Sequence, residues 1–361
     1  MGQGPKVAVV VPAYKAGDVI VQTLKSVSDQ TYRNFEIIVV DDGSPDNTAE
    51  VVQEYARVEP RLRLVRQQNG GVAAARNRGM METQAPLVAP IDSDDLWHPT
   101  RLEKHVAALI RNPGAAFAYS PFRILNGEGR MIGNHPFFAF SGRVFYRQLF
   151  FNMVGNGSGM TFRRDLALAI GGYSPHLREV GLEGCEDWLL QMLMSIDHEV
   201  EHVPEYLIGY RKVPGAMSSD TSRMWRSRIL AAEMLRKEAP PSTWPFIDSA
   251  ELSFSMRLAF QRLQKADPSQ LLRAIGTSVR KGLPIQILEE IEDAAARSRR
   301  QKARILAPGA FFRELDPTVI GPDHLTPRSR RLIERLRRAD ESPPVIEPTA
   351  ITLSGASVLA V

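Results

Sequence analysis

The sequence contains a single cysteine, Cys185, and this scarcity excludes an internal disulfide bond. A lone thiol is typical of proteins from a reducing compartment. The chain also lacks an apolar run of the roughly 18 residues that a transmembrane helix requires. Its first residues lead directly into a short apolar segment, without the basic and longer apolar stretches of a signal peptide. We therefore expect a cytoplasmic protein that neither spans a membrane nor is secreted.

The composition is that of a globular protein, with 361 residues of which 43% are hydrophobic and 24% charged. A chain of this length buries a substantial core. The sequence predicts one large domain over residues 1–220, a helical extension with basic segments over 221–340, and a loose tail over 341–361. Helical spacing marks three segments of the extension: Met224–Lys237, Ala250–Lys265 and Leu271–Lys281.

The first domain alternates predicted strands and helices. Apolar, β-branched runs predict buried strands at Val7–Val11, Phe35–Val40, Leu62–Val65 and Leu87–Ile91. Helical periodicity predicts one helix at Val19–Ser28, a second that runs through Tyr55, and a third at Val72–Met81. This alternation is typical of an α/β fold with a mostly parallel, Rossmann-like sheet flanked by helices. Ligands of such sheets bind beyond the carboxyl ends of the strands.

Three acidic clusters follow one another along this domain: Asp41-Asp42, Asp92-Ser93-Asp94-Asp95 and Glu186-Asp187. The first two directly follow predicted strands, so we expect them at the same edge of the sheet. Transfer of a sugar from a nucleotide needs a divalent cation to neutralise the diphosphate, and carboxylates hold such a cation. The attacking hydroxyl needs a separate carboxylate as general base. A third cluster can accept hydrogen bonds from the nucleoside. The series therefore favours a nucleotide-sugar transferase.

Further motif residues lie in five segments: Val10–Tyr14, Gln30–Tyr32, Phe35–Ser44, Gly70–Gly79 and Asp92–Asp95. Together they resemble the family 2 glycosyltransferases of the GT-A fold, and Glu186–Trp188 and Val203–Arg211 extend the resemblance. The last third of the chain is not covered. The resemblance implies a metal-dependent, inverting transferase that uses Mn²⁺ or Mg²⁺ and a nucleoside-diphosphate sugar, most often a UDP-sugar. The acceptor hydroxyl would belong to a glycan or a lipid-linked intermediate of polysaccharide biosynthesis.

The resemblance also implies roles on the donor side of the site. The residues expected to bind the nucleotide sugar are Pro12, Ala13, Tyr14, Asp42, Arg76, Asp92 and Ser93. In this reading Asp42 accepts a hydrogen bond from the uracil, Arg76 lies near the phosphates, and Asp94 is the metal ligand. Lys15 departs from the asparagine that many relatives carry after the Ala-Tyr pair, which puts the hydrogen bonding of this turn in question.

On the acceptor side, the resemblance makes Asp187 the general base and places Glu186 and Trp188 beside the acceptor. If Glu186-Asp187 begins a helix, the macrodipole would lower the pKa of Asp187 and keep this base ionised. The chain lacks the Gln-x-x-Arg-Trp motif and membrane helices of processive synthases, so a single transfer is expected.

Simpler interpretations of each acidic cluster remain open. Asp41-Asp42 could have the purely structural role of capping a strand-to-helix turn, and Asp92–Asp95 could be a solvated loop. Glu186-Asp187 could have the purely structural role of stabilising a helix N-terminus. Two other functional classes also remain. A sugar nucleotidyltransferase would use a similar sheet and paired carboxylates, and a non-catalytic module would bind a sugar nucleotide without turning it over.

Two other motifs are weaker evidence for a functional site. His198–His202 fits His-Glu-x-x-His, but Pro204 follows closely and the segment alternates like a strand, so a zinc site is not expected. The glycine-rich segment Gly155–Gly159 lacks the lysine of a P-loop. An acceptor-side loop is the favoured interpretation, and its glycines would also suit a hinge that closes over the donor.

Two basic segments dominate the positive charge of the chain: residues 297–304 and residues 328–338. The second interleaves arginines with Leu332, Ile333 and Leu336, a pattern that suits peripheral contact with an anionic membrane surface. The alternative is a helix that packs against the domain through these apolar residues and leaves its arginines in solvent. Nucleic acid is not an expected partner, because no aromatic residues for base stacking accompany the basic runs.

Overall fold

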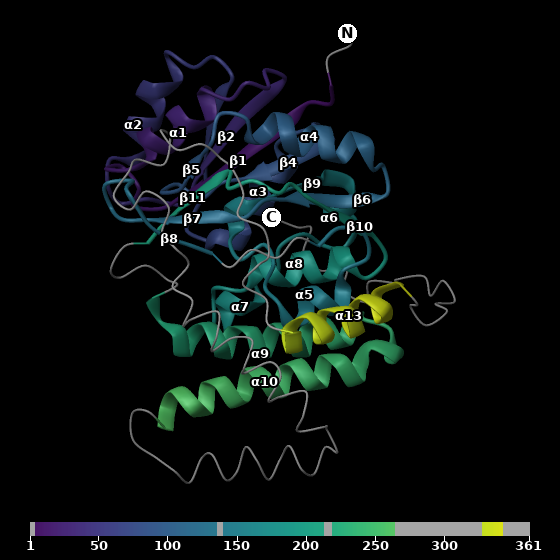
Figure 1. Ribbon diagram of the computed structural model, residues 1–361. Helices are drawn as coiled ribbons and strands as arrows, with labels where there is room; N and C mark the ends of the chain where they lie inside the picture. The colour runs from purple at the N-terminus through teal and green to yellow at the C-terminus, as the bar shows by residue number, and fades with distance from the viewer. Residues whose placement is uncertain (1–3, 136–139, 213–218, 264–326, 342–361) are drawn as a thin grey trace.

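The computed structural model describes residues 4–135, 140–212, 219–263 and 327–341 (Figure 1). Its centre is a seven-stranded sheet in the order β10-β6-β9-β4-β1-β2-β3. The strands are β1 (Val7–Ala13), β2 (Phe35–Asp41), β3 (Leu62–Arg66), β4 (Leu87–Pro90), β6 (Ala115–Tyr119), β9 (Met160–Arg163) and β10 (Glu199–His202). β1 to β4 pair in parallel, and β9 runs antiparallel to both of its neighbours. The α/β prediction is confirmed.

Helices cover both faces of this sheet, and β1 shows why. Val7, Val9 and Val11 enter one hydrophobic core, whereas Ala8 and Val10 enter the other, because successive side chains of a strand point to opposite faces. The first core is covered by α1 (Ile20–Ser28), α2 (Thr48–Ala56) and α4 (Arg101–Arg111). The second is covered by α3 (Val72–Met81), α5 (Phe145–Phe150) and α8 (Glu186–Ser195). Strands buried on both faces therefore read as unbroken apolar runs.

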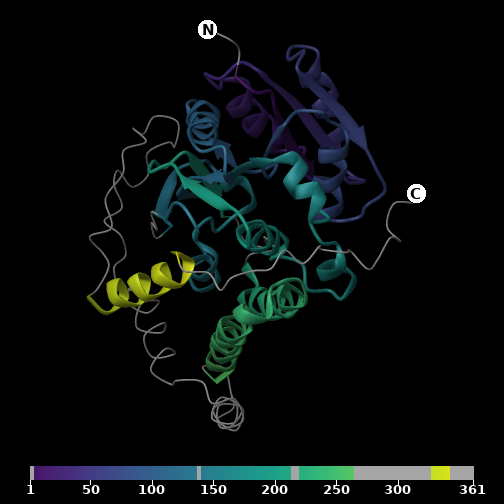
Figure 2. The ribbon, with the colours of Figure 1, turned by 90° about the vertical axis from the view of Figure 1, so that its right-hand side faces the viewer.

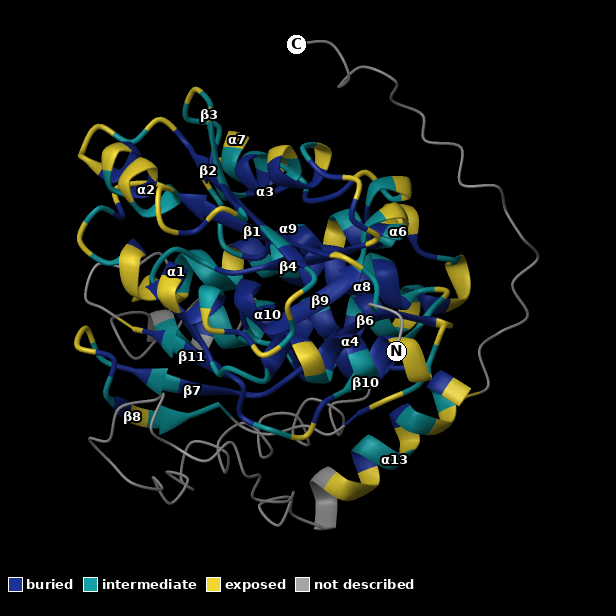
Figure 3. Ribbon diagram, turned by 90° about the horizontal axis from the view of Figure 1, so that it is seen from above, coloured by how far each residue is buried: buried dark blue, intermediate teal, exposed yellow. Residues whose placement is uncertain are grey.

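A second sheet of four strands adjoins the carboxyl end of β4, in the order β5-β11-β7-β8 (Figure 3). Its strands are β5 (Leu96–Trp97), β11 (Ile208–Arg211), β7 (Phe122–Leu125) and β8 (Met131–Asn134). β5 directly follows Asp92–Asp95, and β11 pairs with it. The acidic loop is therefore held between the two sheets.

Short helices connect the central sheet to the C-terminal part. They are the 3-10 turn η1 (Gly157–Gly159), α6 (Arg164–Ala169) and α7 (His176–Glu179). α9 (Thr221–Glu238) and α10 (Trp244–Leu263), joined by η3 (Pro241–Thr243), then form a layer beneath α8 and α5 (Figures 1 and 2). The predicted helices at Met224–Lys237 and Ala250–Lys265 are thus present, with α10 beginning earlier, at Trp244. The predicted helix Leu271–Lys281, the basic segment 297–304 and the predicted tail lie outside the described residues.

The last described helix, α13 (Pro327–Glu341), packs against α5. Leu332 and Leu336 are buried in the shared core, as the packing alternative from the sequence requires. At the end of α13, Asp340 accepts hydrogen bonds from the Tyr146 backbone N–H at 2.7 Å and from Arg147 Nε at 2.6 Å. Within the described part of the chain, no helix has the length and apolar character needed to cross a membrane.

Lys15, in the turn after β1, adopts a φ of 52° and is the non-glycine residue with positive φ among the described residues. This left-handed conformation is unfavourable for a side chain with a Cβ, but asparagine adopts it several times more often than most residues. The asparagine that many relatives carry here therefore suits the backbone better than lysine does.

We expect Lys15→Asn to stabilise the protein by about 0.5–1 kcal/mol relative to Lys15→Ala, because both variants remove the ammonium but alanine retains the backbone strain. Thermal unfolding of the three proteins measures this difference. Equal melting temperatures for the two variants would show that the turn carries no such strain.

Candidate active site

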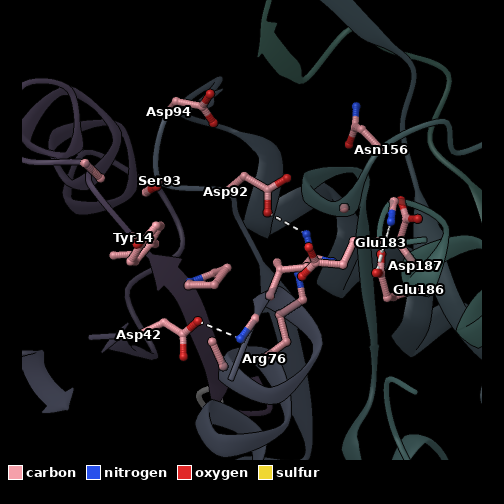
Figure 4. Close-up of a pocket in the computed structure, with 18 of the residues that line it drawn as sticks. Tyr14, Asp42, Arg76, Asp92, Ser93, Asp94, Asn156, Glu183, Glu186 and Asp187 are labelled. Atoms are coloured by element: carbon pink, nitrogen blue, oxygen red, sulfur yellow. Dashed lines mark hydrogen bonds and ion pairs between the residues drawn. The ribbon is translucent and has the colours of Figure 1, made fainter. Parts of the chain in front are cut away.

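A pocket of about 980 Å³ opens at the carboxyl ends of the parallel strands (Figure 4). Ten residues singled out from the sequence line it: Pro12, Ala13, Tyr14, Asp42, Arg76, Asp92, Ser93, Asp94, Glu186 and Asp187. The three acidic clusters come from elements far apart in the chain, and the fold brings all three to this one cavity.

Asp42 lies at the end of β2 and is held by the loop that begins α3. Its Oδ1 accepts hydrogen bonds from Gln67 Nε2 at 2.7 Å and from the Gly70 N–H at 2.8 Å, and its Oδ2 accepts one from the Gly71 N–H at 2.7 Å. These bonds fix the orientation of the carboxylate. Each oxygen has two lone pairs, so the Oδ2 atom retains capacity for a ligand donor.

The loop Asp92–Asp95 contains carboxylates in different environments. Asp95 is fully buried and accepts hydrogen bonds from Ser158 Oγ at 2.5 Å and the Arg211 N–H at 2.9 Å. Asp94 is partly exposed and lines the pocket, and its carboxylate interacts with its own backbone N–H. Burial raises the pKa of Asp94 to about 6, and the negative charge of Asp92 adds to this effect. Asp95 is therefore structural, and Asp94 is the carboxylate available to a ligand.

Ser158 fastens the Asp92–Asp95 loop to the glycine-rich segment. Its hydroxyl accepts a hydrogen bond from the Asp92 N–H at 2.9 Å while it donates to Asp95. Its carbonyl accepts bonds from Trp97 Nε1 at 3.2 Å and from the buried Arg101 at 3.1 Å. The predicted acceptor-side loop is thus bonded to the acidic loop through Ser158.

Arg76, on α3, is the buried cation of the site. Its Nη2 donates to Asp92 Oδ1 at 2.5 Å, and its guanidinium lies 5.2 Å from the centre of the Tyr173 ring. Burial by itself would lower the pKa of Arg76, but the charges of its neighbours, chiefly Asp92, raise this pKa above its ordinary value. A Cβ at Gly157 would lie 2.1 Å from Arg76 Nη2, so only glycine at this position leaves room for the guanidinium.

Glu186 and Asp187 form the first turn of α8, as the sequence predicts. Both Glu186 carboxylate oxygens accept from the Gly184 N–H at 3.0 Å, and burial raises the pKa of Glu186 to about 6. Asp187 Oδ1 accepts from the Trp188 N–H at 2.8 Å.

The expectation that the helix terminus lowers the pKa of Asp187 is wrong. Burial raises the pKa of this carboxyl, and the opposing effects of Arg76 and the Trp188 N–H do not cancel it. Desolvation penalises the charged form more strongly here than the helix N-terminus favours it. A raised pKa suits a general base, because proton transfer is most efficient when the pKa lies near the working pH.

Trp188 requires a correction. It was expected beside the acceptor, but its side chain is 1% exposed and is not part of the pocket lining. Helical geometry turns it away from Asp187 and into the layer of α9 and α10, where it packs edge-on against Phe254 at 6.0 Å and beneath Arg228. Its contribution to the site is to anchor the first turn of α8.

Several lining residues were not assigned a role from the sequence. Arg178 and Glu183 approach Gly71 from the segment before α8, and a Cβ on Gly71 would lie within 3 Å of both. Arg211 lies against the acidic loop and donates from Nε to the Asp94 carbonyl at 2.7 Å. Asn156 lines the pocket beside Gly155 and Gly157. Arg211 ends the segment Val203–Arg211 and Asn156 lies in the predicted acceptor-side loop, but only the tertiary fold shows that these four residues line the pocket.

The His-Glu-x-x-His segment forms strand β10, as expected, so it does not present two histidines on one face of a helix. Glu199 and Glu201 both accept hydrogen bonds from Asn112 Nδ2, at 2.8 and 2.9 Å. Among the described residues no cluster of three or more histidine, cysteine or acidic residues is arranged to hold a metal unaided.

The sheet, the flanking helices and the pocket at the strand ends define the fold of the GT-A glycosyltransferases. Residues 8–169 match the profile of "Glycosyl transferase family 2". Over this segment, which is less than half of the chain, the protein is similar to the members of that family.

Similar proteins carry related names. TuaG of Bacillus subtilis, a glycosyltransferase named for teichuronic acid biosynthesis, is 36% identical over 126 residues, which is 35% of this chain and 50% of that protein. Chondroitin synthase of Escherichia coli is 31% identical over 130 residues, covering 36% of this chain and 19% of that protein. The match spans half or less of both relatives.

Two solved structures share the fold. S. aureus TarS in complex with UDP-GlcNAc superposes with a TM-score of 0.60 at 19% identity, covering 82% of this chain and 88% of that chain. A mannosyltransferase from Pyrobaculum calidifontis in complex with GDP-Man and Mn²⁺ gives a TM-score of 0.55 at 19% identity, covering 83% of each chain.

We expect Ser158→Ala to destabilise the protein by about 2–3 kcal/mol, because the Asp92 N–H and the buried Asp95 carboxylate would each lose a partner. The matched control is Ser174→Ala, which removes only a 3.4 Å contact with the His176 N–H and should cost under about 0.5 kcal/mol. Denaturant unfolding of both variants measures the difference. Equal losses would show that Ser158 does not hold the two loops together.

Proposed function

We propose that the protein is a metal-dependent, inverting, non-processive glycosyltransferase that moves a sugar from a nucleoside-diphosphate sugar, of the UDP type, to a hydroxyl of a glycan or lipid-linked acceptor. One observation carries this proposal. Asp94, which is partly exposed, and Asp187, with a raised pKa, line one cavity with the buried Arg76. A cation ligand, a base and a fixed positive charge are the groups that this transfer needs.

The donor side of the proposal assigns the nucleoside to Asp42 and to Pro12, Ala13 and Tyr14, at the ends of β2 and β1. Arg76 and the loop Asp92–Ser93 would bind the diphosphate and ribose. The solved relatives contain UDP-GlcNAc and GDP-Man in a similar fold, which supports a nucleotide sugar in this pocket without selecting the base or the sugar.

The metal assignment rests on Asp94. A raised pKa beside a second carboxylate marks a position where negative charge is crowded, and a divalent cation relieves such crowding. Mg²⁺ and Mn²⁺ commonly take one or two carboxylates from the protein and their remaining oxygen ligands from substrate phosphates and water. A single available carboxylate therefore fits. When bound, the cation would neutralise charge on the departing nucleoside diphosphate.

The chemical step is a direct displacement. The acceptor hydroxyl oxygen bonds to the anomeric carbon, the bond from that carbon to the phosphate oxygen breaks, and the nucleoside diphosphate leaves with the electron pair. Asp187 takes the hydroxyl proton, and Arg76 stabilises the charge that develops on the phosphate. Attack opposite the leaving group inverts the anomeric configuration.

We expect Asp187→Asn to lower the rate of transfer at least 1,000-fold while donor affinity changes less than about threefold, because the base acts on the acceptor in the transition state. In the unaltered enzyme kcat/KM should fall as the pH drops through a value above the ordinary aspartate pKa, since protonated Asp187 accepts no proton. Release of UDP and of other nucleoside diphosphates from a panel of donors, with Mn²⁺, Mg²⁺ or chelator, provides the measurement.

The matched variant Asp94→Ala should show the opposite pattern, with weakened metal-dependent donor binding. Unchanged turnover in Asp187→Asn would refute the base assignment. Release of pyrophosphate from a nucleoside triphosphate would instead indicate a nucleotidyltransferase. If the protein binds none of the donors, this result would indicate a non-catalytic protein.

The proposal also includes peripheral contact with a membrane, through a smaller surface than the sequence pattern of α13 suggested. The buried Leu332 and Leu336 are used in packing on α5, so the exposed Arg331 and Arg335, which directly precede them on α13, would provide the contact. Each arginine near an anionic surface contributes about 1 kcal/mol.

We expect Arg331→Gln/Arg335→Gln to reduce sedimentation with vesicles containing 30% phosphatidylserine about tenfold or more, roughly the effect of two lost charges, with donor turnover unchanged. The same fraction bound for both proteins, or no binding by either, would remove the membrane from the proposal.

A further inference from the structure

Asn156 is a buried pocket residue with no partner for its side chain. Its residue exposure is 5%, and no described atom lies in hydrogen-bonding position to either its Oδ1 or its Nδ2. A buried amide that lacks partners costs free energy of about 1–3 kcal/mol, so native structures rarely retain one. Because Asn156 also lines the pocket, a ligand bound there is the candidate partner for this amide.

The usual local role of an asparagine at this position is not fulfilled. Asn156 immediately precedes η1 in extended conformation, at the N-cap position where asparagine commonly accepts a hydrogen bond from the following backbone. No such capping bond forms. The residue therefore has neither a local nor a tertiary partner among the described residues, although both its acceptor and its two amide donors are buried.

The segment around Asn156 has little freedom to move. A Cβ at Gly155 would lie 2.8 Å from the Phe122 ring, and a Cβ at Gly157 would meet Arg76. Ser158, two residues further on, is bonded to Asp92 and Asp95. The carboxamide is thus held at a fixed place relative to the loop that, in the proposed function, binds the diphosphate.

The position of Asn156 favours the sugar over the nucleoside. Figure 4 shows Asn156 on the side of Glu186 and Asp187, away from Asp42. The transferred sugar must lie between the diphosphate and the base that activates the acceptor. A neutral carboxamide offers donors and an acceptor to sugar hydroxyl groups, each of which can donate and accept.

We propose that Asn156 binds the transferred sugar of the donor through hydroxyl groups and thereby sets the sugar specificity of the enzyme. This inference rests on the proposed function and deepens it. A site built to hydrogen-bond a hydroxyl discriminates strongly against an analogue that lacks it, since the buried polar groups are then left unpaired. Asn156 has this arrangement before any sugar binds.

The test uses Asn156→Ala in the full chain, with UDP, the accepted UDP-sugar and its monodeoxy analogues as ligands. We expect kcat/KM for the accepted sugar to fall about 10- to 100-fold, the effect of one or two neutral hydrogen bonds. The affinity for UDP alone should stay within about twofold. Discrimination against one deoxy analogue, large in the unaltered enzyme, should largely disappear in the variant.

The melting temperature distinguishes sugar binding by Asn156 from a purely structural role of this residue. Because Asn156 makes no internal hydrogen bond, Asn156→Ala should leave the melting temperature of the ligand-free protein unchanged or higher. The matched control is Asn112→Ala, which removes bonds to Glu199 and Glu201 far from the pocket. This control should lower the melting temperature and keep the discrimination between sugars.

Three outcomes would overturn the inference. Equal losses for the sugar and all its deoxy analogues, with a lower melting temperature, would show that Asn156 only supports the loop. Unchanged hydrolysis of the donor with loss of transfer alone would assign Asn156 to the acceptor. Retained discrimination would show that Asn156 does not bind the sugar. If the unaltered protein turns over no sugar nucleotide, the proposed function itself fails, and this result is distinct from the other three.

Discussion

The site depends on the buried ion pair between Arg76 and Asp92. Arg76 is bonded to Asp92 and interacts electrostatically with Asp187, and both carboxyls would otherwise crowd negative charge at the edge of the sheet. A buried charge is tolerated only when it is paired and hydrogen-bonded. The guanidinium also needs the space that is free because Gly157 has no side chain. It lies against the Tyr173 ring. Helix α3, the acidic loop and the glycine-rich segment are thus fixed around a single ion pair.

The sequence was sufficient to predict the four parallel strands β1 to β4 and the acidic residues of the pocket, because the signals involved are local. Ile37–Val40 and Leu87–Ile91 are apolar runs directly followed by aspartates, and the rule for parallel sheets then brings Asp42 and Asp92 together. Even the turn at Lys15, marked by its departure from the family pattern, proved conformationally unusual. Residue types and spacing alone carry this kind of information.

The remainder depended on tertiary burial, which no local pattern encodes. The pKa of Asp187 follows from how deeply α8 is packed against its neighbours, and the helix terminus alone suggested the opposite direction. Trp188 and Asp187 are adjacent in sequence but face the core and the pocket respectively. The glycine-rich segment predicts an acceptor-side loop but does not distinguish Asn156 within it, because an asparagine among glycines is typical of any loop. Its significance appears only when the partners of its side chain are examined.

The bond between α13 and α5 has a consequence for how the chain folds. Arg147 and Asp340 have side chains that are 7% and 0% exposed, so removing either partner leaves an uncompensated buried charge, a change that typically costs 3–5 kcal/mol. The two residues are 193 positions apart in sequence. Helix α13, which lies well beyond residues 8–169, is thus bonded back to a helix within that segment. The core that α5 and α13 share is therefore complete only after residue 340 has been synthesised.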